Sequence, residues 1–96
     1  MFVESSKPQV YSMLRSNASE SVLLVANLSD KPVSGYYLTL HNGPLKAGYR
    51  ASMLVSSTIP GSKLLGAPFI NPAGGFSPYT PLAALPPYSA YLILLK

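Results

Sequence analysis

The chain has no cysteine and no tryptophan. Without cysteine it forms no disulfide, no thiolate metal site and no cysteine nucleophile, although this absence does not fix its compartment. Tryptophan offers the largest area for stacking on a sugar ring, so a sugar platform here would have to use smaller aromatic rings.

Charge is also scarce. Charged residues make up 10% of the 96 residues and hydrophobic residues 48%, whereas an ordinary soluble domain is about 25% charged. The chain therefore has little material with which to solvate its whole surface. We interpret it as a domain of a larger protein or as an obligate oligomer, part of whose surface is covered by a partner.

The net charge of +4 reflects three acidic residues against seven basic ones. The basic residues are scattered, whereas nucleic-acid-binding proteins gather them on one element, so we expect no nucleic-acid partner. No apolar run approaches the roughly 18 to 20 residues that cross a bilayer, and we expect no membrane partner. The first seven residues lack the features of a signal peptide.

The acidic residues and the histidine are poorly placed for chemistry. Glu20 and Asp30 flank one predicted strand and lie about 25 Å apart at strand rise, whereas a glycosidase pair needs about 5 to 9.5 Å. His41 has no cysteine and no carboxylate close in sequence with which to build a metal site. We therefore predict no catalytic residue, no metal site and no cofactor.

Ten prolines and seven glycines interrupt the chain about every ten residues, which is typical of an all-β sandwich or barrel. No window keeps a helical apolar period. We predict one domain over residues 9–96, preceded by an N-terminal tail or linker remnant over 1–8. The expected strands span 9–15, 21–28, 33–41, 49–57, 76–80 (a short edge strand) and 88–95, with turns at 16–20, 29–32 and 71–75 and a possible short strand at 63–65.

The last strand is apolar on both faces except at Ser89. Pro86 and Pro87 withhold two backbone donors, so we expect regular pairing to begin only after them. The strand over 21–28 is likewise apolar on both faces except at Asn27. Since each face of such a strand must be covered, we predict a central pair with the core on one side and a neighbouring domain on the other.

Tyrosine is the aromatic residue with functional promise. Tyr36 and Tyr37 face opposite sides of a strand, as do Tyr88 and Tyr91, so one of each pair should lie outward or at an interface. These four are our candidates for sugar or interface contacts, and packing within the fold is the alternative for each. Asn17 and Asn27 begin glycosylation-type tripeptides, which we interpret as structural, with Asn27 bonded to backbone at a strand end.

Three segments in order carry a family resemblance: 22–29 (VLLVANLS) followed by Pro32-Val33, then 45–49 (LKAGY), then 85–91 (LPPYSAY). Together with an early strand that ends in Met13-Leu14-Arg15, they resemble the C-terminal β-sandwich domain of the α-amylase superfamily, glycoside hydrolase family 13. The resemblance covers about 10–95 and is weakest over 58–77.

The resemblance implies an antiparallel Greek-key β-sandwich of about six to eight strands, with no significant helix, packed on a catalytic (β/α)8 barrel. In that family the catalytic carboxylates and calcium sites belong to the barrel, so none falls on this chain. We therefore expect a non-catalytic accessory domain of an α-amylase-type glycoside hydrolase or glucanotransferase. The alternatives are an α-glucan-binding module that uses exposed tyrosines and, more weakly, a free-standing immunoglobulin-like interaction domain. An isolated domain has a further way to cover its outer face, which is to dimerise.

Overall fold

The computed structural model describes residues 3–17, 20–46, 48–56, 66 and 68–96. Over these residues the chain is all-β, with nine strands and only antiparallel pairing. No helix in the described ranges is long and apolar enough to cross a membrane. The all-β prediction is confirmed, with slightly more strands than expected.

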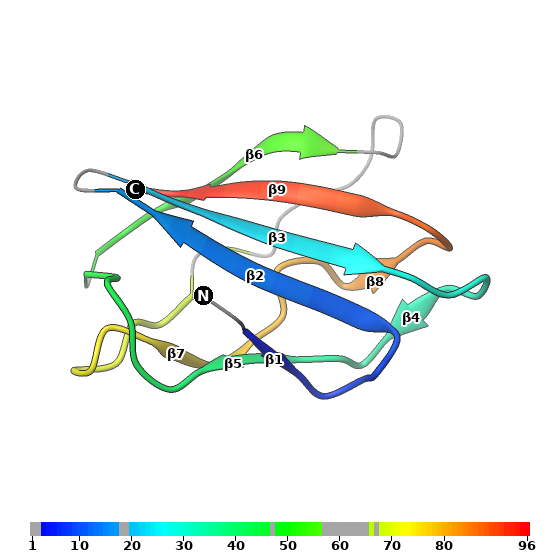
Figure 1. Ribbon diagram of the computed structural model, residues 1–96, viewed down its shortest axis with the longest axis horizontal. Helices are drawn as coiled ribbons and strands as arrows, with labels where there is room; N and C mark the ends of the chain where they lie inside the picture. Colours follow the sequence, from blue (N-terminus) through cyan, green and yellow to red (C-terminus); the bar gives the residue numbers. More distant parts are fainter. Residues whose placement is uncertain (1–2, 18–19, 47, 57–65, 67) are drawn as a thin grey trace.

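The strands form two main sheets and a short pair (Figure 1). The order of the four-stranded sheet is β2-β3-β9-β6, and that of the three-stranded sheet is β1-β5-β7. In the first, the last strand of the chain lies between β3 and β6, an order that Greek-key connections produce. The bounds are β1 Glu4–Ser5, β2 Val10–Ser16, β3 Ser21–Asn27, β4 Val33–Ser34, β5 Leu38–Leu40, β6 Ala51–Ser56, β7 Phe76–Tyr79, β8 Ala84–Leu85 and β9 Ala90–Leu95.

The core lies between the two main sheets. Alternate residues of each strand point into it, because successive side chains of a strand face opposite sides. From β3 these are Leu23 and Val25, and from β9 Ile93 and Leu95, all fully buried. The core cluster as a whole comprises Val3, Val10, Leu14, Leu23, Val25, Val33, Tyr36, Leu38, Leu40, Leu45, Phe76, Tyr79, Leu82, Leu85, Tyr91, Ile93 and Leu95.

The two doubly apolar strands are indeed the central pair. β3 pairs with β2 on one side and β9 on the other, and β9 also pairs with β6. Leu23 lies opposite Ile93 on the inner face, and Leu24 lies opposite Leu92 on the outer face. The prediction of a central pair, with the core on one side of it, is confirmed.

The strand expected over 33–41 is wrong as a single element. Gly35 has a positive φ of 67°, a conformation that glycine adopts without steric cost. The chain bends there, so that β4 pairs with β8, whereas β5 pairs with β1 and β7. A single glycine thus moves the chain from the end of the sandwich to the three-stranded sheet.

The predicted N-terminal tail is also part of the fold over residues 3–8. Val3 is fully buried in the core, and β1 pairs with β5 in the register Glu4↔Thr39. A two-residue strand among polar residues leaves too short a periodic signal to be seen in a sequence. Pairing before the two prolines was missed for the same reason, since β8 ends at Leu85.

The expected turn at 71–75 is confirmed. The Asn71 Oδ1 atom accepts hydrogen bonds from the N–H groups of Ala73 and Gly75, both at 2.9 Å. The following strand β7 is an edge strand, as predicted. The possible strand at 63–65 falls outside the described residues.

Asn27 is buried and bonds to backbone at the end of β3, as expected. Its Nδ2 lies 2.8, 3.0 and 3.1 Å from the carbonyl oxygens of Lys31, Leu85 and Pro86. Its Oδ1 accepts from the N–H and the hydroxyl of Ser29. The side chain therefore joins the turn after β3 to the segment that leads into β9, a structural role.

Candidate docking face

The outward side of the four-stranded sheet is almost entirely apolar, and we call it the apolar outer face. On β2, β3 and β9, and at Ser52 of β6, the residues that alternate with the core residues point away from the three-stranded sheet. All but three of these residues are half-buried, Ala26 being buried and Arg15 and Ser52 exposed. The face consists of Tyr11, Met13, Arg15, Val22, Leu24, Ala26, Ser52, Ala90, Leu92 and Leu94.

Strand register arranges this face in three rows. The first contains Tyr11, Ala26 and Ala90, and the second contains Met13, Leu24 and Leu92. The third contains Arg15, Val22, Leu94 and Ser52. Neighbouring side chains within a row lie about 4.5 to 5.5 Å apart, so the apolar groups form one continuous surface.

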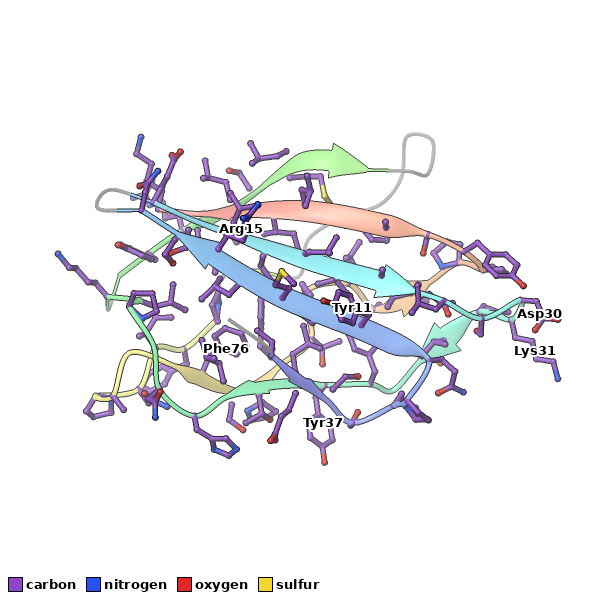
Figure 2. The ribbon with its side chains drawn as sticks, in the orientation of Figure 1. Tyr11, Arg15, Asp30, Lys31, Tyr37 and Phe76 are labelled. Carbon is purple, nitrogen blue, oxygen red and sulfur yellow. The ribbon has the colours of Figure 1, made fainter. Side chains whose placement is uncertain are left out.

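Polar groups stand only at the margin of the face. Arg15 is its single charged residue, and Tyr11 and Arg15 lie toward opposite ends of β2 (Figure 2). Ser52 occupies the β6 side of the third row. Next to it, Leu54 falls where the pairing with β9 shifts register, and its side chain is half exposed.

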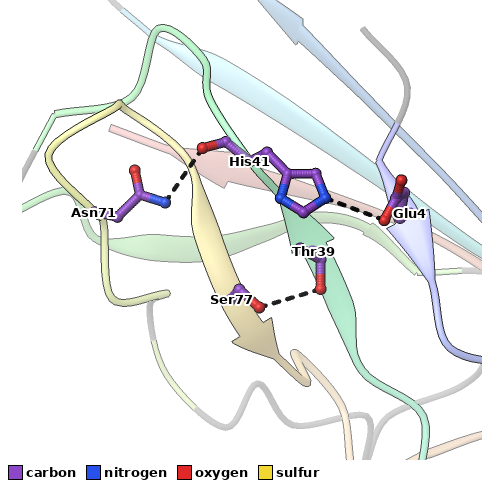
Figure 3. Close-up of polar contacts among 5 residues, drawn as sticks. All are labelled: Glu4, Thr39, His41, Asn71 and Ser77. Atoms are coloured by element: carbon purple, nitrogen blue, oxygen red, sulfur yellow. Dashed lines mark hydrogen bonds and ion pairs between the residues drawn. The ribbon is translucent and has the colours of Figure 1, made fainter.

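The outward side of the three-stranded sheet is polar by contrast (Figure 3). The hydroxyls of Thr39 and Ser77 lie 3.2 Å apart, and the His41 Nε2 atom is 3.3 Å from a carboxylate oxygen of Glu4. Asn71 donates to the His41 carbonyl oxygen at 3.4 Å. These groups satisfy one another or face water, so this side needs no cover.

Sequence reasoning missed the contact between Glu4 and His41, because the two residues are far apart along the chain. Both side chains are well exposed, and exposed ion pairs stabilise a fold by only about 0 to 1 kcal/mol. No group of three or more histidine or acidic residues that could hold a metal ion occurs in the part of the chain that the structure describes.

In each tyrosine pair one ring is buried and the other exposed. Tyr36 and Tyr91 are each 1% exposed and belong to the core, whereas Tyr37 is 50% and Tyr88 71% exposed. Burial raises the pKa of Tyr36 to about 12. Only Tyr37 and Tyr88 among the four candidates can thus reach an outside partner.

The sequence also indicates two outward residues of β2, Tyr11 and Met13, that our prediction did not include. Tyr11 and Met13 alternate with the core residues Val10 and Leu14 along β2. Apolar residues at the outward positions of a strand indicate a covered outer face, so Tyr11 and Met13 could have been predicted together with the outward residues of β3 and β9.

No family model, no curated protein and no solved structure matches this chain.

Proposed function

We propose that the chain is a non-catalytic accessory domain that docks on a neighbouring domain of the same polypeptide through the apolar outer face. The supporting observation is the contrast between its two outward surfaces. One is a continuous apolar surface over β2, β3 and β9, and the other is a polar surface with its own hydrogen bonds. Apolar patches of this kind mark interaction sites.

The size of the face favours a tethered neighbour over a second copy. Three rows across four strands cover about 300 to 400 Å² at standard strand spacings. A stable complex of free proteins buries about 800 Å² on each partner. A domain in the same chain is held at high effective concentration and needs a smaller interface.

The positive charge of Arg15 indicates a further property of the partner, a carboxylate that faces it. Arg15 is the only charged residue of the face, and no acidic residue stands among its positions. A carboxylate on the partner would complement this guanidinium at the margin of the interface, where it would fix orientation rather than add much affinity. A second copy of the chain would offer no carboxylate from the same face.

For the identity of the neighbour we propose the catalytic (β/α)8 barrel of an α-amylase-type glycoside hydrolase or glucanotransferase. This part of the proposal is supported by the resemblance of residues 22–33, 45–49 and 85–91 to the C-terminal domain of that superfamily. The docked domain would shield apolar surface of the barrel and stabilise it. The chain itself would contribute no catalytic group.

Calorimetry of the full-length gene product that carries this chain tests the docking. With a docked domain we expect a single unfolding transition, because docked domains unfold together. Leu92→Lys places a charge in the centre of the face and should split off a second transition at the melting temperature of the isolated chain. Thr39→Lys, on the polar side, is the matched control and should leave one transition.

Identical calorimetric traces for the unmodified gene product and its Leu92→Lys and Thr39→Lys variants would contradict docking through this face. A gene product with no further domain would contradict it as well. Hydrolysis or transfer of α-glucan by the same product tests the identity of the neighbour separately. If two coupled domains are found but no α-glucan is processed, the docking stands and the family assignment falls.

A second candidate function is α-glucan binding at Tyr37. Its ring is 50% exposed, and Tyr37, Thr39 and His41 alternate with core residues along β5 and its flanks. An exposed ring beside hydroxyl and carboxylate groups is the composition of a sugar subsite. Calorimetric titration with maltoheptaose tests it: Tyr37→Ala should abolish the binding, and no heat from the unmodified chain at millimolar sugar would exclude it.

A further inference from the structure

Tyr88 has a backbone conformation that does not suit it. Its φ is +52°, and it is the one non-glycine residue with positive φ in the described part of the chain. The left-handed region is sterically unfavourable for L-residues and is normally occupied by glycine or asparagine. For a bulky aromatic residue it is a true outlier.

The Tyr88 side chain contributes little to the fold. The residue is 71% exposed, and its hydroxyl has no hydrogen-bond partner among the described residues. Its backbone N–H donates to the Ser29 carbonyl oxygen at 3.1 Å, a bond that any residue but proline could form. Tyr88 thus combines an unfavourable backbone conformation with an exposed ring that does not pack in the core.

Backbone pairing places Tyr88 at the end of the four-stranded sheet, beside the turn that follows β3. The ladders of the sheet continue past the strand ends, where Leu28 N–H donates to Gln9 and Asn27 N–H donates to Ser89, each at 2.8 Å. Leu28 is 63% exposed and lies with Tyr11 at the margin of a shallow groove whose other lining residues are Glu4, Ser5, Lys7, Pro8 and Val10. Leu28 and Tyr88 therefore both stand at the end of the four-stranded sheet, next to the row that contains Tyr11.

We propose that Tyr88 is the anchor of the docking interface, with its ring inserted into an apolar pocket of the neighbouring domain. The inference rests on the proposed function. Tyrosine is among the residues that most often dominate binding energy, because its ring is large and loses little conformational freedom. The free hydroxyl calls for a polar group at the floor of that pocket, and Leu28 would pack at its rim.

The variant Tyr88→Asn tests the anchor, because asparagine tolerates the left-handed conformation and removes the ring. In the isolated chain it should raise the melting temperature by about 4 to 8 °C through relief of strain. In the full-length gene product it should increase the rate at which hydroxyl radicals oxidise Met13, in the centre of the face, by about threefold or more. Tyr37→Asn, which removes an exposed ring on the polar side, is the matched control and should leave the Met13 rate unchanged.

Other results would overturn the anchor in distinct ways. A lower melting temperature of the isolated chain would mean that the ring supports the fold itself. An unchanged Met13 rate with Tyr88→Asn, but a raised one with Leu92→Lys, would retain the docking and remove the anchor. An unchanged rate with both variants would remove the docking as well. If Tyr88→Asn abolishes maltoheptaose binding while Met13 stays protected, the ring stacks on sugar instead.

Discussion

The hydroxyl of Tyr36 engages both backbone groups of Leu82. It donates to the Leu82 carbonyl oxygen at 2.8 Å and accepts from the Leu82 N–H at 3.2 Å. Leu82 precedes β8 and Tyr36 follows β4, so this buried pair supports the short β4–β8 ladder at the end of the sandwich. It places the chain that leads into β9, one of the strands that form the apolar outer face.

Removal of this hydroxyl by Tyr36→Phe should lower the free energy of unfolding by about 1 to 3 kcal/mol, because two buried backbone groups lose their partner. Urea unfolding monitored by circular dichroism measures the change. Tyr37→Phe is the matched control, since its side chain is exposed, and its effect should stay below about 0.5 kcal/mol. Equal losses in the two variants would contradict the assigned role of the buried hydroxyl.

The same tyrosine should make the fold sensitive to alkali. Its pKa is raised to about 12 by burial, whereas the unfolded chain ionises near the ordinary value of 10. Above pH 10 the unfolded state therefore loses this proton first, so stability is full below pH 10 and falls as the pH rises toward 12. The loss from Tyr36 should reach about 2 to 3 kcal/mol, and burial of Tyr79 raises its pKa and acts in the same direction.

Urea unfolding between pH 8 and pH 11 measures this dependence. In the Tyr36→Phe variant the decline should be shallower by about one proton, because the group that titrates has been removed. Parallel pH profiles for the two proteins would show that Tyr36 does not carry the effect.

Asn27 should be far less replaceable than the other asparagine of a glycosylation-type tripeptide. Asn27→Ala removes the Nδ2 donor from three carbonyl oxygens, although hydroxyl donors remain for two of them: Ser29 for Lys31 and Ser89 for Pro86. It also leaves the Ser29 N–H without its acceptor, and we expect a loss of about 2 to 3 kcal/mol. Asn17 is exposed, and its side chain accepts a bond from the Glu20 N–H at 2.9 Å. Because exposed polar groups contribute little to stability, Asn17→Ala should lose less than about 1 kcal/mol. Chemical denaturation of both variants compares them, and similar losses would contradict the structural role of Asn27.

Leu23 and Leu24 form a matched pair for the two sides of the larger sheet. Leu23 is fully buried in the core, whereas Leu24 is half-buried on the apolar outer face. In the isolated chain Leu23→Ala should lower the free energy of unfolding by about 2 to 5 kcal/mol and Leu24→Ala by less than about 1 kcal/mol. Equal losses, measured by urea unfolding, would mean that the outer face is already covered within the chain itself.

The sequence allowed the central strands to be predicted because their apolar residues are continuous. β3 and β9 carry apolar residues on both faces, and this pattern is visible without any structure. The break after β4 was hidden, because a glycine inside an apolar run does not reveal whether it bends the chain. β1 and β8 were missed because two residues carry no period, and the contact between Glu4 and His41 depends on a pairing of distant segments.

The candidate tyrosines illustrate a second limit. Alternation indicates that one ring of each pair lies outward, and burial assigns Tyr37 and Tyr88 to that position. The alternation in the sequence does not reveal the positive φ of Tyr88, because such a conformation is normally indicated by glycine or asparagine and not by tyrosine. The two exposed rings are of the same residue type and differ in their position within the fold: Tyr37 lies on the polar side and Tyr88 at the end of the four-stranded sheet.

The account is tested most directly by the rate at which hydroxyl radicals oxidise side chains in the isolated chain and in the full-length gene product. Docking predicts that Tyr11, Met13 and Leu92 react at least about fivefold more slowly in the full-length protein, because a neighbouring domain excludes solvent from them. Tyr37 and His41, on the polar side, should react equally in both. Equal rates for Tyr11, Met13 and Leu92 in the two proteins would contradict docking through the apolar outer face.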